Sequence, residues 1–493
     1  MTVRRAAIWS LAAQYTTFAV QFAASVIISR FFLLPADVGL FSIALAAAMV
    51  VSIFQDMGIT RFVSGQPEMR DDLVRDYAGV AVAISLAVAV GLAFAAPLLA
   101  RFYDQPALTD LMWLIAASYL ISPFATVPVA LQIREMKFRT LFQVNAGSAL
   151  AGNGTAVALA SQGFGAASLA WGVLVTAVVR AAIALAVRPV LPRIPNSAAA
   201  IRPLLGFSSS SFVISASAAI GQRSQDLIVG RLLGVISTGL FSRASALSGQ
   251  LSTLVTGAIN SVFYPAFARK RDAGESLASP YLHLVACNTA LNWAAMVGLA
   301  LAAEPIVLLL YGNNWASVAP LLRWTAIGEM LFVAVPLQMD IPILLGRIRT
   351  LIWVNLIDTF AAVALLASAC LWGLEAAAIS RILYGMIWLA IYATFQSHLL
   401  GIRLRELFAI YARSAACALA AGIPLVVASA LGWHGAALGF SGLILLSGMG
   451  VLTWLAALRL TRHPAWAEVS LSCATLALPV LSRIFRALSP ASR

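Results

Sequence analysis

The sequence predicts an all-α integral membrane protein with about 14 transmembrane helices, in two six-helix lobes related by a parallel internal repeat and followed by a C-terminal helix pair. Three observations lead to this fold class. Long apolar runs follow one another almost without interruption, positive charge gathers in every second loop, and the second part of the chain repeats features of the first. Together they predict the number of spans, their direction and their grouping.

The composition is that of a chain built to lie in lipid. Hydrophobic residues make up 61% of the 493 residues and charged residues only 10%, whereas a soluble protein carries about 25% charged residues. A helix needs about 20 apolar residues to cross a bilayer. The first apolar run is too long for the core of a secretion signal and a second follows at once, so we expect it to remain on the protein. The expected spans lie near 6–29, 38–59, 77–99, 108–131, 140–161, 164–188, 204–229, 237–262, 280–303, 319–345, 350–371, 374–398, 407–431 and 435–458.

Positively charged residues alternate from loop to loop. With these spans, the N-terminus and every second loop carry 21 Lys and Arg residues, and the intervening loops carry only Arg30, Arg101 and Arg231. Positive loops stay in the cytoplasm, which predicts a multi-pass protein with both termini cytoplasmic. The net charge of +13 reflects mostly this bias, so we expect no nucleic-acid partner. The moderately apolar tail is expected to lie in the cytoplasmic interface, with a short re-entrant segment as the alternative.

Two segments about 200 residues apart repeat one another. The tetrapeptide Gly-Leu-Phe-Ser occurs at 39–42 and again at 239–242, and an arginine precedes it in both copies, Arg30 and Arg231. Because six spans are an even number, both copies run in the same direction, as in transporters whose halves are related by an axis along the membrane normal. We therefore expect an N-terminal lobe at 1–200, a C-terminal lobe at 201–400, an appended helix pair at 401–463 and an interfacial tail at 464–493.

Polar residues recur on one face of the first and seventh spans. The spacing of Gln14 and Gln21 with the neighbouring serines and threonine places them on one helical face, and Ser215 and Gln222 take comparable positions in the seventh span. Helix packing through small and polar side chains is one interpretation. The recurrence of the stripe favours the other, that both faces line a wet cavity between the halves. These four residues are therefore candidate substrate-binding residues.

Ionisable residues also lie within the spans, where such groups usually face an interior or a pathway. Buried cations suit an anionic substrate, and arginine binds phosphate through paired hydrogen bonds. The candidate substrate-binding cations are Arg223 and Arg243, then Arg30 and Arg381. The candidate charge-pairing or coupling acids are Asp56 and Asp226. Structural ion pairing is the alternative for each residue.

Several longer segments are more characteristic than the Ala-rich remainder. They are QDLIVGRLLGVISTGLFSRA at 225–244, NSVFYPAFARKRD at 260–272, LLYGNNWASVAPLLRW at 309–324 and SRFFLLPADVGLFSIA at 29–44. Over about 6–400 the chain resembles the Wzx-like, polysaccharide-transport branch of the multidrug/oligosaccharidyl-lipid/polysaccharide exporter superfamily. The matched residues are largely architectural in that family: Arg30, Gly39, Arg231, Gly239, Pro265, Tyr311, Gly312 and Trp315.

The resemblance implies a flippase of the bacterial inner membrane. Such a protein moves an undecaprenyl-pyrophosphate-linked oligosaccharide repeat unit from the cytoplasmic to the periplasmic leaflet by alternating access, for exopolysaccharide, capsule or O-antigen. A polysaccharide polymerase and the export machinery are the implied partners. We expect no catalytic residue, metal or cofactor, because the cysteines and histidines are scattered singly.

Three other functions are alternatives to the flippase. A cation-coupled multidrug antiporter shares the superfamily architecture, but residues 6–29 contain no acid that could couple transport to a cation. A membrane polysaccharide polymerase or ligase would need larger outer loops with clustered acids or histidines, and the predicted outer loops are short. A scramblase or a scaffold is the third alternative.

Overall fold

The computed structural model describes most of the chain, and every regular element in the described residues is a helix. This confirms the all-helical class. Some helical positions, among them 201–219, are described by their backbone alone. The described residues are 3–52, 55, 59–65, 70–194, 198–433 and 439–470.

The contacts between residues divide the chain into two compact units. The first unit consists of Met1–Arg243, Leu310–Val318 and Ile352–Ala377, and the second of Ala244–Leu309, Ala319–Leu351 and Ala378–Arg493. The first unit therefore contains the expected N-terminal lobe together with three segments from beyond it. The lobes at 1–200 and 201–400 stay a prediction from the internal repeat.

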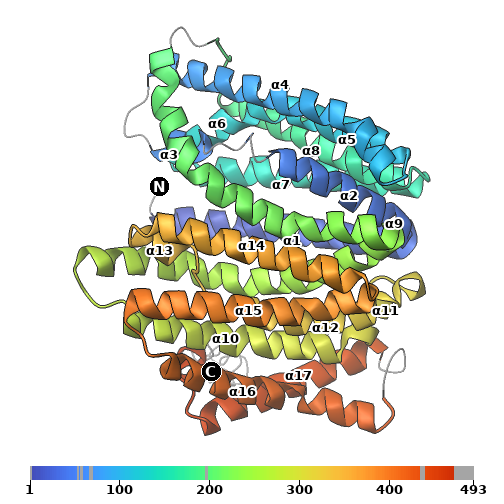
Figure 1. Ribbon diagram of the computed structural model, residues 1–493, viewed down its shortest axis with the longest axis vertical. Coiled ribbons are helices and arrows are strands. Elements are labelled where there is room, and N and C mark those ends of the chain that lie inside the picture. Colours follow the sequence, from blue (N-terminus) through green and yellow to red (C-terminus); the bar gives the residue numbers. More distant parts are fainter. Residues whose placement is uncertain are drawn as a thin grey trace, which may run out of the picture. The chain divides into compact units, whose positions relative to one another are not determined.

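The first unit is a bundle in which α4, α5 and α8 run alongside one another, with α2 against α5 (Figure 1). Large apolar side chains such as Leu92, Met112 and Ile115 are fully covered in its core, between small residues such as Ala44 and Ala170. The first nine helices of the chain all begin in this unit: α1 (Val3–Phe31), α2 (Pro35–Ser52), α3 (Ile59–Gly65), α4 (Asp71–Phe102), α5 (Ala107–Ile121), α6 (Pro123–Arg134), α7 (Phe138–Ser161), α8 (Ala166–Val187) and α9 (Ala198–Asp272).

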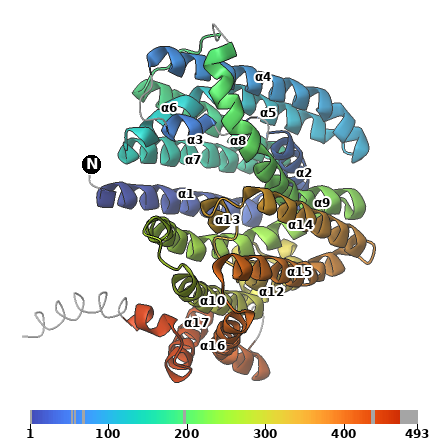
Figure 2. The same cartoon turned by 60° about the vertical axis from the view of Figure 1, so that its left-hand side comes forward.

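Small residues let the helices of this unit approach closely. Helix α7 packs along both α1 and α8 (Figure 2). At the crossing of α7 and α8, a Cβ atom added to Gly152 would lie 2.6 Å from the carbonyl oxygen of Gly172. Side chains larger than hydrogen are therefore excluded here, as is usual where membrane helices pack by backbone contact.

A proline and a glycine interrupt the helices of the first unit at two places. The expected span 108–131 is divided into α5 and α6, which meet at an angle of 45°. Pro123 occupies the first turn of α6, where its missing N–H is harmless, but it cannot continue the hydrogen-bond ladder of α5. The expected seventh and eighth spans are two helical stretches of α9 that a kink at Gly234 separates (φ 85°, ψ 176°), in a conformation that glycine adopts without strain.

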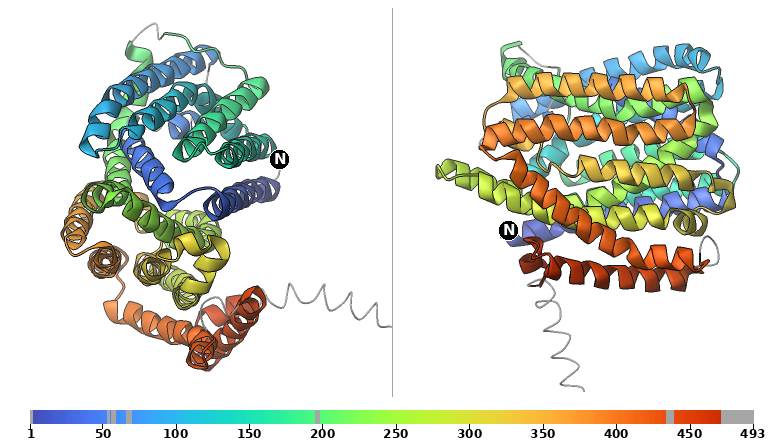
Figure 3. Two further views of the ribbon diagram at one scale, coloured as in Figure 1. Left: turned by 90° about the vertical axis from the view of Figure 1, so that its right-hand side faces the viewer. Right: turned by 60° about the horizontal axis from the view of Figure 1, so that its bottom comes forward.

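The second unit carries the C-terminal helix pair. Helix α10 packs along α16, and α16 packs along α17; α16 and α17 are the orange-red to red helices of Figure 3. The expected tenth span 319–345 is shorter as a helix, because α12 ends before the irregular segment 333–339 that contains Pro336. The remaining elements are α10 (Ala278–Leu301), α11 (Ala303–Leu310), η1 (Asn313–Trp315), α12 (Val318–Phe332), α13 (Asp340–Leu344), α14 (Ile348–Cys370), α15 (Leu374–Leu400), α16 (Leu404–Ala430) and α17 (Gly439–Leu460).

The helices that can cross a bilayer are numerous. Within the described residues, nine helices are long and apolar enough to span, or ten if the bent pair α5 and α6 forms one span. The chain is thus a multi-pass membrane protein. The count of fourteen spans and the cytoplasmic position of the termini stay predictions.

A buried histidine fastens the end of α17 to the rest of the second unit. The backbone N–H of Ala465 donates to Nδ1 of His463 (3.2 Å), so the ring proton lies on Nε2 and is donated to Ser414 (3.0 Å). Ser414 is hydrogen-bonded in turn to Thr289 of α10 (2.8 Å). Burial, with a smaller contribution from Arg413, lowers the pKa of His463 to about 4. The histidine is therefore neutral at physiological pH.

Candidate functional site

The two copies of Gly-Leu-Phe-Ser meet each other in the first unit. A Cβ atom on Gly39 would lie 1.8 Å from the carbonyl oxygen of Val235, and one on Gly239 would lie 1.9 Å from that of Pro35. The hydroxyl of Ser42 donates to that of Ser242 across the same crossing (3.1 Å). We call Gly39, Ser42, Gly239 and Ser242 the repeat contact. The tetrapeptide thus occurs twice because each copy packs against the other.

Arg243 follows the repeat contact directly and lies among three other side chains of the first unit. One guanidinium nitrogen donates to the hydroxyl of Ser25 in α1. The guanidinium carbon is 5.9 Å from the ring centre of Tyr311 and 5.7 Å from that of Trp315, which is within cation–π range. We call Arg243, Ser25, Tyr311 and Trp315 the Arg243 cluster. The structure therefore places Arg243 against α1, next to the polar stripe of the first span.

The positive charge of Arg243 has no carboxylate to balance it among the described residues. Its Nε atom is enclosed and has no hydrogen-bond partner there. Ring quadrupoles and one hydroxyl compensate a cation less well than an ion pair does. The guanidinium of Arg243 is therefore held by weaker contacts than an ion pair would provide.

Arg223, the other leading candidate, lies near a second polar group of the first unit. It is half-buried and interacts electrostatically with Tyr119. On the neighbouring turn, the Gln55 amide donates to the hydroxyls of Ser85 (2.7 Å) and Ser122 (2.5 Å). This arrangement joins a cation with hydroxyl and amide groups, which are the usual partners of a phosphate and of sugar hydroxyls.

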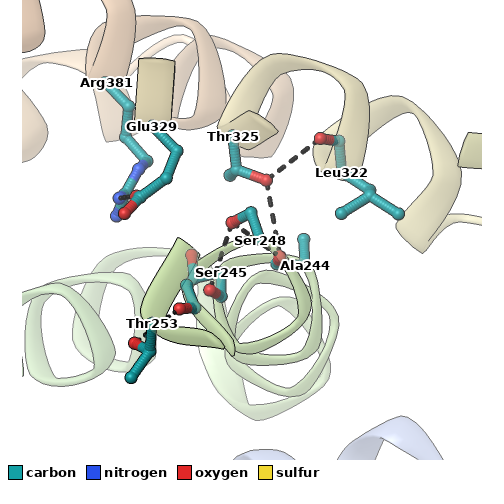
Figure 4. Close-up of polar contacts among 9 residues, drawn as sticks. Ala244, Ser245, Ser248, Thr253, Leu322, Thr325, Glu329 and Arg381 are labelled. Carbon is teal, nitrogen blue, oxygen red and sulfur yellow. Dashed lines mark hydrogen bonds and ion pairs between the residues drawn. The ribbon is translucent and has the colours of Figure 1, made fainter. Parts of the chain in front are cut away.

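Arg381 is held differently, by an ion pair within the second unit. Its guanidinium lies 3.3 Å from Oε2 of Glu329, and the two side chains are 17% and 15% exposed (Figure 4). Its guanidinium carbon is 5.4 Å from the ring centre of Phe332. Helix α12 reaches α15 closely here, since a Cβ on Gly328 would lie 3.2 Å from Cβ of Arg381. The positive charge of Arg381 is thus neutralised inside the unit.

The remaining predicted site residues are placed as follows. Gln14 and Gln21 of α1 are exposed. Arg30, in the last turn of α1, is exposed and lies 5.9 Å from the ring centre of Phe31. Asp226 is nearly covered, at 8% exposure. The predictions for Asp56 and for the side chains of Ser215 and Gln222 lie outside the described residues.

Sequence reasoning missed the side chains that the structure places around two of the predicted arginines, Arg243 and Arg381. Glu329 was not among the candidate acids, and Tyr311 and Trp315 entered only as architectural residues of the resemblance. The usable signal for the last two was the motif itself, because an aromatic pair in a short polar turn near an intramembrane arginine favours a cation–π contact. Glu329 and Arg381 are 52 residues apart and carry no such local signal.

Comparisons with known proteins agree with this architecture. The family described as "Polysaccharide biosynthesis protein" matches residues 27–320. The chain is 27% identical over 392 residues to the succinoglycan biosynthesis transport protein ExoT of Rhizobium meliloti (strain 1021), covering 79% of this chain and 77% of ExoT. It is 23% identical over 303 residues to the lipopolysaccharide biosynthesis protein WzxC of Escherichia coli (strain K12), covering 59% of this chain and 60% of WzxC.

Two solved structures share the fold. The lipid II flippase MurJ in an inward closed conformation superimposes with a TM-score of 0.73 at 14% identity, covering 91% of this chain and 97% of that one. An inward-facing multidrug resistance transporter of the MATE family gives a TM-score of 0.55 at 15% identity, covering 78% and 94%. At these identities the likeness concerns the fold alone, and the family match covers more than half of the chain. The chain therefore belongs to the polysaccharide biosynthesis protein family, and its resemblance to the Wzx-like branch is confirmed.

Proposed function

We propose that this chain is a flippase that moves an undecaprenyl-pyrophosphate-linked oligosaccharide from the cytoplasmic to the periplasmic leaflet of the bacterial inner membrane. Membership of a polysaccharide biosynthesis family and the similarity to a succinoglycan transport protein support a carrier rather than an enzyme. A pyrophosphate bears about two negative charges and cannot enter hydrocarbon alone. Such a carrier has to present cations along a wet, enclosed path.

The observation that carries the proposal is that no carboxylate in the described part of the chain forms an ion pair with Arg243. An arginine paired with a carboxylate would have to exchange one anion for another before it could bind substrate. Arg243 has a hydroxyl and two rings instead. A pyrophosphate oxygen arriving there gains a charge-assisted hydrogen bond without displacing a carboxylate. The site thus favours an anionic headgroup over a neutral or cationic solute.

Arg223 supplies the second cation of the proposed path. Tyr119 interacts with it, and the Gln55 amide reaches the carbonyl oxygen of Tyr119 (3.4 Å), so that these groups suit the sugar that follows the pyrophosphate. Gln14 and Gln21 on the uncovered face of α1 offer further amides along the same helix that contacts Arg243. We propose that these residues together guide the headgroup, while the polyprenyl chain stays in lipid.

Deletion of the gene and complementation with variants tests this function. We expect deletion to remove surface polysaccharide and to accumulate lipid-linked oligosaccharide on the cytoplasmic side. Arg223→Ala and Arg243→Ala should each lower export by about tenfold or more, since about 1.4 kcal/mol of lost anion binding is one factor of ten. Lysine at either position should restore part of the export, because it keeps the charge and loses the planar fork.

Arg101→Ala is the matched control, because Arg101 is an exposed cation in the last turn of α4 that belongs to neither cluster. Its export should equal that of the unaltered chain. Normal export by both alanine variants at normal membrane levels would contradict the cationic path. Unchanged polysaccharide and precursor after gene deletion would contradict the function itself.

A further inference from the structure

The segment Tyr311–Trp315 enters the protein interior from a tight turn. Gly312 adopts φ 83° and ψ −176°, a conformation that side chains other than hydrogen rarely adopt, and η1 follows it directly. Tyr311 is 2% exposed and Trp315 is fully buried. A connection between two helices therefore places two aromatic side chains in the buried interior.

Trp315 completes the C-terminal end of α1. Its indole N–H donates to the carbonyl oxygen of Ser29 (2.8 Å). Ser29 lies in the last turn of α1, where carbonyl groups have no partner within the helix. The contact joins residues 286 positions apart, so it ties the end of the first span to a connection of the second repeat copy.

Arg243 contacts α1 one turn earlier than Trp315 does. Ser25 and Ser29 are four residues apart and lie on the same face of the helix. Arg243 holds the first through its guanidinium, and Trp315 holds the second through its indole. The ring of Trp315 also faces the guanidinium of Arg243. The indole thus positions Arg243 and fastens α1 with the same side chain.

On the other side of Arg243, the repeat contact joins a further pair of helices. Ser242, its neighbour in α9, is hydrogen-bonded to Ser42 of α2. Gly39 and Gly239 bring the two backbones together beside it. Helices α1 and α2 of the first repeat copy are therefore both joined to α9 of the second, at the end that the distribution of Lys and Arg assigns to the outer side.

We infer that the segment Tyr311–Trp315 is a latch, in which Trp315 and Tyr311 position Arg243 and hold α1 and α2 against α9 so that this end of the first unit is closed. Opening requires Arg243 to leave the rings and Ser25. The inference rests on the proposed function, because an anionic headgroup that reaches Arg243 competes with these neutral partners and releases the latch. Tyr311 and Trp315 are positioning residues in this scheme and do not bind substrate.

Accessibility of the repeat contact tests the latch without any substrate. In the full chain with its four cysteines replaced, Ser42→Cys is labelled with a membrane-impermeant maleimide in right-side-out and inside-out vesicles. Trp315→Phe keeps the ring and removes the indole N–H, and should raise the labelling rate about fivefold, the factor that one lost net hydrogen bond represents. Arg243→Lys should also raise it. Trp353→Phe, on an exposed face of α14, is the control and should not.

A reversible cross-link tests whether this end has to open. The hydroxyl oxygens of Ser42 and Ser242 are 3.1 Å apart, so cysteines at both positions can form a disulfide with little movement. Oxidation should block polysaccharide export, and a reductant should restore it. Mass tagging of free thiols reports the extent of the cross-link.

The outcomes separate the latch from the proposed function. Equal labelling in the Trp315→Phe, Arg243→Lys and Trp353→Phe backgrounds would overturn the latch, and so would normal export by the cross-linked chain. Neither result would contradict the proposed transport function. Unchanged polysaccharide after gene deletion would overturn the function, while the labelling rates would still decide whether Tyr311–Trp315 closes this end.

Discussion

Two intramembrane arginines of this protein are held by opposite chemistry. Arg381 of the second unit forms an ion pair with Glu329, and both side chains are largely covered. Arg243 of the first unit has a hydroxyl and two aromatic rings around it, and no carboxylate among the described residues pairs with it. A neutralised cation stabilises its surroundings, whereas an uncompensated one can accept an anion. We propose that this difference separates a structural arginine from one that serves transport.

Removal of Arg381 should give the largest effect. Arg381→Ala leaves Glu329 uncompensated in a covered position, which costs about 3–5 kcal/mol of unfolding free energy. We expect a strongly reduced amount of folded protein in the membrane, measured by size-exclusion fluorescence in detergent. The double variant Arg381→Met with Glu329→Met should recover most of that amount, because an apolar pair of similar volume can replace a buried ion pair. A double variant as poor as the single one would contradict a purely structural pair.

His463 differs from both arginines, because this buried basic residue is uncharged at physiological pH. Its pKa is lowered from 6.5 to about 4 in the folded protein, so protons bind the unfolded state more tightly. Stability should therefore fall as the pH drops from about 6.5 towards 4, by about 3 kcal/mol in total, and change little above that range. Thermal unfolding in detergent between pH 8 and about 4 measures this.

The control for that pH series is His398→Gln, at an exposed position near the end of α15, which should leave the dependence unchanged. His463→Gln can keep a donor for Ser414 and should flatten the curve in the same range. A curve that keeps its slope in the His463→Gln variant would assign the pH dependence to other groups.

Replacement of Arg243 should have a smaller effect on stability than replacement of Arg381. Arg243→Met loses one hydrogen bond and two cation–π contacts, and it also removes an uncompensated charge, so we expect a net change of about 1 kcal/mol or less. Export should nevertheless be lost. Thermal unfolding and polysaccharide analysis on the same variant measure the two effects. A loss of stability as large as that of Arg381→Ala would erase the distinction between the arginines.

Ser42→Ala should have an effect on stability of the same small size as that of Arg243→Met. It removes the hydroxyl that donates to Ser242 and leaves the Gly39–Gly239 packing intact. One exchanged hydrogen bond contributes about 0.5–1.5 kcal/mol, so the unfolding temperature should fall by no more than a few degrees. Ser85→Ala is the matched control substitution, because Ser85 is a fully covered serine that is hydrogen-bonded to Gln55 and lies outside the repeat contact. If the latch operates, Ser42→Ala and not Ser85→Ala should speed the labelling of Ser242→Cys.

The helical membrane class could be predicted from the sequence, because long apolar runs leave a local signal, whereas the two lobes and the substrate-binding arginines stay predictions. The offset of 200 between the two Gly-Leu-Phe-Ser copies also matches the Ser42–Ser242 contact. The bend at Pro123 was missed because the apolar run continues through it. The partner of Arg381 was missed because a contact across 52 residues depends on the packing of α12 against α15, which no local pattern encodes.

The repeat contact also has a consequence for the ancestry of the chain. A glycine that packs against its own repeat copy, with a serine bonded to its own copy three residues on, has the geometry of an isologous interface between identical subunits. A single six-helix ancestor would have formed this contact with a second molecule of itself. Fusion of two such genes would then have turned a dimer interface into an intramolecular one. Each substitution in one tetrapeptide would afterwards disturb the packing of the other.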